Sequence, residues 1–223
     1  ALLAHEHFHL WNVKRIRPRA LGPFDYGQEI YTKELWIVEG ITSFFDDHTA
    51  FRGGLFTQEE YLDVLAQTIT LTENEKATRV NSLSESSFDA WIRFYRKDEN
   101  MFNRTVSYYI KGGLISLLLD LHIIKNSNTR YSLDDVMCDL YQLYKKRPEL
   151  GITRDEFFDS VEKFLKFDRA QFIKDYIDGT QKIPWEPVFK DFGIWFKNQE
   201  QETPYDVGFI LEEKFGKVFI KNV

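Results

Sequence analysis

The chain opens with the stretch ALLAHEHFH (residues 1–9), in which His5, Glu6 and His9 form the pattern H-E-x-x-H. If the stretch is helical, His5 and His9 project from one face, one turn apart, and can bind the same metal ion. Glu6 then lies about 100° around the helix from His5, so its carboxylate can reach a water on the metal without being a ligand. This geometry is typical of a zinc hydrolase, although an exposed helix start that happens to contain two histidines would show the same sequence pattern.

A second stretch supplies a candidate for the remaining ligand. Catalytic zinc takes three protein ligands and keeps one position open for water, so two histidines are one ligand short. The segment KELWIVEGITSFFDD (residues 33–47) is strongly apolar and predicts a buried helix with an acid, Glu39, at its centre. Burying a carboxylate is costly unless it is paired or binds a cation. Glu39 is therefore the candidate third ligand; the alternative is that it faces solvent or pairs with Lys14 or Arg15.

The surroundings of Glu39 contain candidates for supporting roles. Ser43 and Asp46 lie four and seven positions after Glu39, on the same helical face, so either side chain could accept a hydrogen bond from a histidine ring. Asp46 and Asp47 could equally be plain surface acids. Gly40 lowers helix propensity by roughly 1 kcal/mol, which predicts close approach of another element, here the helix over residues 1–14 that carries His5 and His9 (the metal helix).

Composition narrows the class of protein. The chain has 223 residues and a formal net charge of −6, which argues against nucleic acid or an anionic membrane surface as the main partner. With Cys138 as the single cysteine, an intrachain disulfide and a cysteine-rich zinc site are both excluded. We find no apolar run of 18 residues and expect no membrane span.

The periodicity of apolar residues predicts a mainly α fold with a short β segment at the C-terminus. Residues 81–102 read as irregular, and two short alternating runs at 207–211 and 217–220 read as a hairpin. Helices are expected over residues 1–14, from about 32 to 47, and over 57–75, 103–125, 133–147, 154–166 and 169–178, with a last short helix after Pro184.

Several motifs together resemble the glycyl aminopeptidase family of zinc metallopeptidases. They are HEHFHLWNVKRIRP (residues 5–18), PFDY (23–26), WIVEG (36–40), DD (46–47) and YYIKG (108–112). The resemblance implies that residues 1–196 are the helical part of a thermolysin-like, glutamate-zincin catalytic domain whose sheet lies upstream. It implies that residues 204–223 are the first strands of a truncated PDZ-like domain. The sequence leaves the compartment open, and a bacterial cytoplasm or periplasm is the expectation.

The resemblance also implies roles for particular residues. His5, His9 and Glu39 would bind Zn²⁺, Glu6 would act as general base, and the Tyr109 hydroxyl would donate to the oxyanion of the tetrahedral intermediate. From the residues alone, a tyrosine beside an apolar helix is more often a core aromatic, and the neighbouring Tyr108 competes for the role.

The expected substrates are peptides, from which an aminopeptidase would release small N-terminal residues, glycine first and then alanine. Two other functions remain open on the sequence. One is a catalytically silent scaffold that binds peptides through the PDZ-like segment, and the other is an endopeptidase with the same zinc site. The sequence leaves the oligomeric state open.

Overall fold

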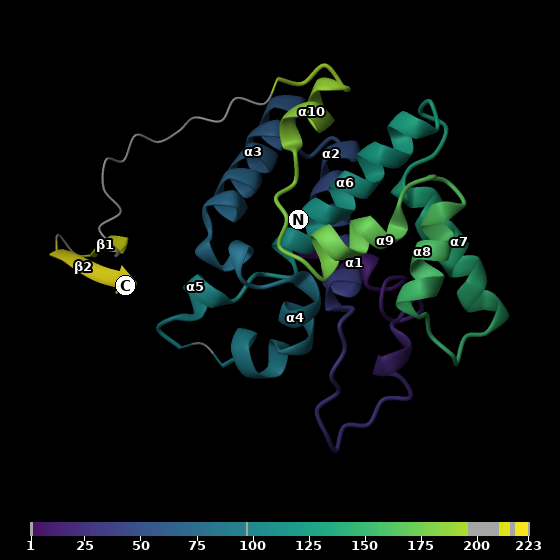
Figure 1. Cartoon of the computed structure of the whole chain (residues 1–223), viewed down its shortest axis with the longest axis horizontal. Coiled ribbons are helices and arrows are strands. Elements are labelled where there is room, and N and C mark those ends of the chain that lie inside the picture. The colour runs from purple at the N-terminus through teal and green to yellow at the C-terminus, as the bar shows by residue number, and fades with distance from the viewer. Residues whose placement is uncertain (1, 97, 196–209, 215–216, 223) are drawn as a thin grey trace.

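The computed structural model describes residues 2–96, 98–195, 210–214 and 217–222 (Figure 1). The described chain is mainly helical, as the sequence predicts. The α-helices are α1 (Leu2–Phe8), α2 (Ile41–Arg52), α3 (Gln58–Asn74), α4 (Leu83–Phe88), α5 (Met101–Arg104), α6 (Ile110–Asn126), α7 (Leu133–Lys146), α8 (Arg154–Glu162), α9 (Arg169–Phe172) and α10 (Trp185–Lys190). Shorter turns are the 3₁₀ helices η1 (Arg19–Leu21) and η3 (Lys76–Arg79) and the π-helices η2 (Trp36–Gly40), η4 (Ala90–Phe94) and η5 (Ile173–Ile177).

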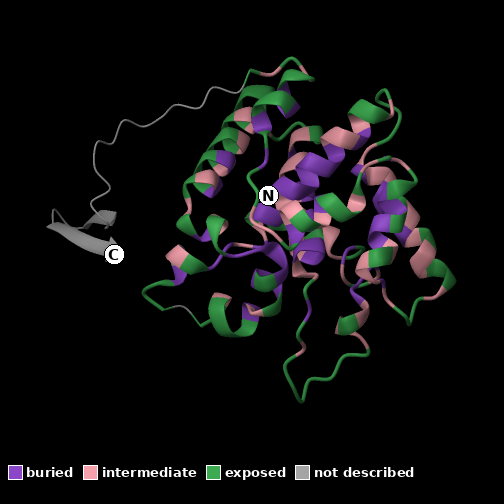
Figure 2. Ribbon diagram, viewed as in Figure 1, coloured by how far each residue is buried: buried purple, intermediate pink, exposed green. Residues whose placement is uncertain are grey.

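Helix α6 runs through the core of the helical part, and Figure 2 shows it largely buried. Its apolar side chains pack against α2 and η2, and Ile115 and Ile123 are fully shielded from solvent. Burying one such side chain contributes roughly 1.5–3 kcal/mol, so this central helix fixes where η2 and α2 lie. Those two elements carry Glu39 and Asp46.

The contact between η2 and α6 is made by two glycines. A Cβ added to Gly40 would come within 2.6 Å of the backbone of Gly112, and one added to Gly112 would come within 2.9 Å of Gly40 Cα. Neither position has room for a side chain. The close approach predicted for Gly40 is therefore real, but its partner is α6 and not the metal helix.

The metal helix is shorter than predicted. It ends at Phe8 instead of continuing to residue 14, and His9 lies in the turn that follows. The His9 N–H still donates to the carbonyl of His5 at 3.2 Å, so helical spacing between the two histidines is kept. Val13 has a φ of 140°, a conformation that no helix contains, and this prevents further extension.

The region from residue 81 to residue 109 also differs from prediction. Residues 81–102 are not irregular, because Ser82 and Glu85 form a capping box that starts α4. The helix predicted from residue 103 begins only at Ile110. Val106 lies outside any helix because its N–H donates to Asn81 Oδ1 at 3.0 Å and its carbonyl accepts a bond from Ser86.

The remaining helices follow their start signals. Thr57 and Thr153 each form the predicted capping box, with Glu60 and Glu156, at the starts of α3 and α8. Ser132 caps α7. Helix α8 ends at Glu162, four residues earlier than predicted.

Strands β1 (Ile210–Lys214) and β2 (Lys217–Asn222) pair antiparallel, with Lys214 opposite Lys217. This agrees with the predicted hairpin, shifted by up to three residues at its first strand. Residues 204–209, with which the predicted second domain begins, lie outside the described residues, so the division at 196 and 204 stays a prediction. Within the described part, no helix combines the length and the apolar character that crossing a membrane needs.

Candidate metal centre

His5, His9 and Glu39 converge from two elements that lie far apart in sequence. Nε2 of His5 and Nε2 of His9 each lie 3.3 Å from Oε2 of Glu39. In a tetrahedral site with bonds of about 2.0–2.1 Å, neighbouring ligand atoms lie about 3.3–3.4 Å apart. Among the described residues, His5, His9 and Glu39 form a group that could hold a metal ion, because their donor atoms all lie within 4.8 Å of one another. The spacing fits zinc.

The second nitrogen of each imidazole has its own acceptor. His5 Nδ1 lies 3.0 Å from Oδ2 of Asp46, and His9 Nδ1 lies 2.8 Å from the carbonyl oxygen of Asn12. Both acceptors require a proton on Nδ1, which leaves the lone pair on Nε2 in each neutral ring. Both lone pairs then face the carboxylate oxygen of Glu39. Such an arrangement is repulsive unless a proton on one of the rings or a metal ion lies between them, so the donor set fits a metal ion.

Burial and charge shift two groups of this cluster. The hydrogen bond with Glu39 raises the pKa of His9, with burial working in the opposite direction. Burial raises the pKa of the Asp46 carboxyl, and the neighbouring charge of Asp47 adds to this. The protein groups around the site therefore favour positive charge at His9 and disfavour the charged form of the Asp46 carboxyl.

Asn12 joins the ligand elements, and sequence reasoning missed it. Its side chain is fully buried, and Nδ2 lies 2.9 Å from the carbonyl oxygens of both Ile37 and Val38 in η2. The backbone carbonyl oxygen of Asn12 accepts a hydrogen bond from Nδ1 of His9. Asn12 thus links two segments: the turn that contains His9 and the π-helix η2 that contains Glu39. The sequence offers little signal for this role, because an asparagine after a helix usually marks only the helix end.

The side chains of α1 rest on α2 through Phe8. The Phe8 and Phe45 rings stack with centroids 4.4 Å apart and an interplanar angle of 20°. Phe45 is buried on α2, one residue before Asp46. The Phe8–Phe45 stacking and the Asp46–His5 hydrogen bond both hold α1 against α2.

Glu6 and Tyr109 line the same open depression as the three candidate ligands. The depression has a volume of about 610 Å³, and Ser43 and Asp46 also contribute to its wall. The Tyr109 ring lies nearly parallel to the His5 ring, with centroids 6.2 Å apart. Burial, and then the charge of Glu39, raise the pKa of Tyr109, so its hydroxyl keeps its proton. The structure thus brings together all five residues singled out as ligands or catalytic groups.

Tyr108 and Ser43 are the alternatives to Tyr109 and Asp46. Tyr108 is buried, and its hydroxyl lies 3.3 Å from that of Tyr95, outside the wall of the depression. Ser43 lines the depression, but no hydrogen bond joins it to either candidate histidine within the described chain. Of Ser43 and Asp46, it is Asp46 that forms a hydrogen bond with His5.

Comparison with known proteins places these residues in a family. The model of the M61 glycyl aminopeptidase family matches residues 1–115, which include the two histidines, Glu6, Glu39 and Tyr109. A crystal structure of an aminopeptidase N family protein from Idiomarina loihiensis is similar at 31% identity, with a TM-score of 0.89. That match covers 100% of this chain and 40% of the other, so the chain spans less than half the length of this relative. No curated protein matches. The described helices are part of an aminopeptidase-like fold, and the chain belongs to the M61 glycyl aminopeptidase family.

Proposed function

We propose that this chain is the metal-binding part of a zinc-dependent aminopeptidase that releases small N-terminal residues, glycine and alanine, from peptides. The observation that carries the proposal is the approach of two imidazole Nε2 atoms to one carboxylate oxygen at 3.3 Å. The residues that would hold Zn²⁺ are His5, His9 and Glu39. Bound zinc would supply an activated water nucleophile at neutral pH and would polarise the scissile carbonyl.

The chain's own groups would handle the proton. The Glu6 carboxylate lines the depression without being one of the three converging donors, which suits a general base. It would accept one proton from the attacking water and deliver that proton to the leaving amine. The Tyr109 hydroxyl, kept protonated by burial, would donate a hydrogen bond to the oxygen that becomes negative in the tetrahedral intermediate.

The preference for free N-termini and small residues is supported by family membership. The matched family is described as glycyl aminopeptidase, and the similar crystal structure belongs to the aminopeptidase N family. The PDZ-like character of the C-terminal strands is proposed on the same sequence resemblance, and a bacterial cytoplasm or periplasm is the proposed location.

The first experiment measures metal content of the full-length protein, purified without chelators, by elemental analysis. We expect about one zinc per chain in the wild type and a loss of most of it in Glu39→Ala, because removing one of three ligands leaves an incomplete site. A variant of an acid that is not in the cluster, Asp63→Ala on α3, is the control and should keep its zinc. Full zinc content in Glu39→Ala would remove Glu39 from the ligand set.

A second experiment separates the peptidase classes. Zinc-loaded protein is given matched peptides with a free or an acetylated N-terminal glycine. Cleavage of the free peptide alone supports an aminopeptidase, whereas cleavage of the acetylated peptide identifies an endopeptidase. Zinc binding without cleavage of either peptide would favour a catalytically silent scaffold.

A further inference from the structure

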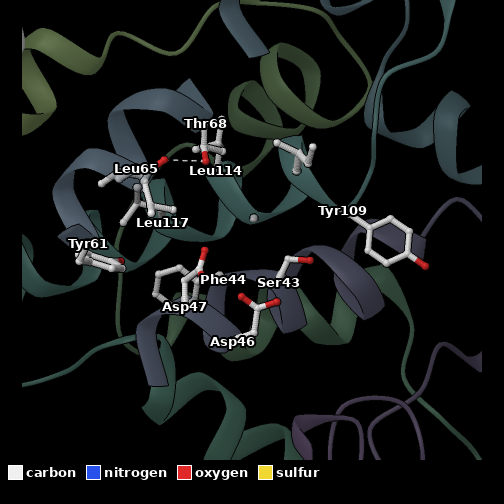
Figure 3. A pocket seen from close by; sticks show the side chains of 13 residues that line it. Ser43, Phe44, Asp46, Asp47, Tyr61, Leu65, Thr68, Tyr109, Leu114 and Leu117 are labelled. Atoms are coloured by element: carbon white, nitrogen blue, oxygen red, sulfur yellow. Dashed lines mark hydrogen bonds between the residues drawn. The ribbon is translucent and has the colours of Figure 1, made fainter. Parts of the chain in front are cut away.

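A second cavity, drawn in Figure 3, shares part of its wall with the depression that contains His5, His9 and Glu39 (the metal depression). It has a volume of about 240 Å³ and lies between α2, α3 and α6. Ser43, Asp46 and Tyr109 line both this pocket and the metal depression. A peptide held at the metal centre would therefore have one of its side chains next to the pocket mouth.

The lining is mostly apolar, and its charged groups are acidic. Figure 3 shows Phe44, Leu65, Leu114 and Leu117 around the pocket, with Tyr61 at one end and Tyr109 at the other. Its charged lining residues are the acids Asp46 and Asp47, and no basic side chain is among the residues that line it in the described chain. The pocket thus suits an aliphatic or aromatic side chain and disfavours a negatively charged one.

The volume indicates one side chain. Pockets for whole drug-sized ligands typically measure about 300–1,000 Å³, and this pocket is smaller. An N-terminal glycine has no side chain to place in it, and alanine has only a methyl group. If the pocket received the N-terminal side chain, the enzyme would prefer large N-terminal residues, which contradicts the proposed function.

We infer that this pocket binds the side chain of the substrate's second residue, the first residue of the leaving peptide, and selects aliphatic and aromatic side chains there. The inference rests on the proposed function for which bond is cut. It identifies the residues that decide which peptides are good substrates among those that share an N-terminal glycine. The pocket wall from α3, which includes Leu65 and Thr68, then sets the size limit.

The test measures kcat/KM for tripeptides Gly-X-Ala in which X is Gly, Leu, Phe or Glu, with full-length zinc-loaded protein. We expect Leu and Phe to exceed Gly by roughly 10–200-fold or more, the range that one methylene group supplies in an apolar pocket, and Glu to be the poorest. Equal kcat/KM for Leu and Gly would overturn the inference while leaving the proposed function standing. The absence of any cleavage would contradict the proposed function instead.

Two threonines of α3 provide a matched pair of variants. Thr68 lines the pocket and Thr70 does not, and the hydroxyl of each donates to the carbonyl four residues earlier. Thr68→Phe fills the pocket and is expected to lower the Leu-to-Gly ratio of kcat/KM by about tenfold or more, whereas Thr70→Phe leaves the ratio unchanged. Leu65→Ala, which enlarges the pocket, should shift the preference from Leu towards Phe.

A binding measurement tests the pocket without turnover. In the Glu6→Gln background, calorimetry compares the affinities of Gly-Leu-Ala and Gly-Gly-Ala, with and without Thr68→Phe. The leucine peptide is expected to bind about tenfold more tightly or better, and Thr68→Phe should remove that advantage. Equal affinities, or a change in the preference for the N-terminal residue in place of the second, would overturn the inference.

Discussion

The Asp46 carboxylate accepts a hydrogen bond from Nδ1 of His5 at 3.0 Å, and the Nε2 atom of the same ring faces Glu39 at 3.3 Å. Asp46 therefore sets which nitrogen of His5 is free to bind a metal. Such partners of a ligating histidine typically change metal affinity by about 10–100-fold when removed.

Asp46→Ala should weaken zinc binding by about 10–100-fold without abolishing it. Asp47→Ala is the control, because Asp47 is the adjacent acid and, within the described residues, makes no hydrogen bond to His5 or His9. Zinc affinity is measured by competition with a chromophoric chelator. Equal losses in the two variants would mean that general negative charge, and not the bond to His5, supports the site.

Glu6→Gln should keep about one zinc per chain and lose more than nine tenths of the peptidase rate. The amide has the size of the carboxylate but cannot accept the proton from water, and general-base catalysis contributes about 10²–10⁴-fold. The measurement pairs elemental analysis with initial rates on the full-length protein. A variant that retained more than a tenth of the wild-type rate would exclude Glu6 as the base.

Tyr109→Phe should lower kcat by about 10²–10³-fold with little change in KM, because the lost hydroxyl is needed only where negative charge develops. Tyr108→Phe is the control, since that hydroxyl lies 3.3 Å from Tyr95 and outside the depression wall. Steady-state kinetics of both variants distinguish the two tyrosines. Equal effects on kcat would assign the role to neither residue in particular.

Gly112→Ala should destabilise the fold by several kcal/mol, since its Cβ would come within 2.9 Å of Gly40 and overpacking of this kind typically costs about 1–3 kcal/mol or more. Gly113→Ala should be tolerated, because its Cβ would meet no atom closer than 3.5 Å. Chemical denaturation of the two variants gives the comparison. Similar stabilities would mean that η2 and α6 can move apart to fit the added methyl group without lowering the free energy of unfolding.

Lys111 makes the stability of the fold depend on pH. It is buried, and its Nζ has no hydrogen-bond partner within the described residues. Burial lowers the pKa of Lys111 to about 8, although Glu73 and Glu75 oppose the shift. The folded state therefore binds fewer protons than the unfolded state between about pH 8 and the usual lysine pKa of about 10.4. The free energy of unfolding should rise with pH across this window.

Lys111→Met should remove that rise and stabilise the chain at pH 7. The expected gain is on the order of 3 kcal/mol, since each pKa unit corresponds to about 1.4 kcal/mol. Urea denaturation of both proteins at pH 7 and pH 9.5 measures the difference. A wild-type advantage at pH 7 would show that the buried ammonium is stabilised by its surroundings.

The candidate site was largely predictable, because much of its chemistry is encoded locally. H-E-x-x-H fixes the spacing of His5 and His9 whatever surrounds them, and an acid in an apolar stretch drew attention to Glu39. Sequence could not decide between Ser43 and Asp46, since that choice depends on where α1 lies across α2. Asn12 was missed for the same reason, because its acceptors lie on η2, a segment 25 or more residues away.

The fold was predictable where start signals and long apolar periods agree, as at Thr57 and Ser132. Prediction failed where side chains take over backbone hydrogen bonds. Val106 is held by Asn81 and Ser86 and not by a helix, so α6 starts seven residues later than its apolar pattern suggests. Helix α4 has only six residues, too few for its periodicity to be recognised.

The π-helix η2 makes the hydrogen bonds between Asn12 and η2 depend on chain length. A π-helical turn inside an α-helix corresponds to one additional residue, and each residue of an α-helix turns the chain by about 100°. Deleting Val38 would turn η2 into a plain α-helix while Glu39, Gly40 and α2 stayed packed on α6. The Val38 carbonyl would be lost, and the segment before the deletion would rotate by that angle, carrying the Ile37 carbonyl away from Asn12. A family of such sequences would therefore tolerate substitution here more readily than the loss of a single codon.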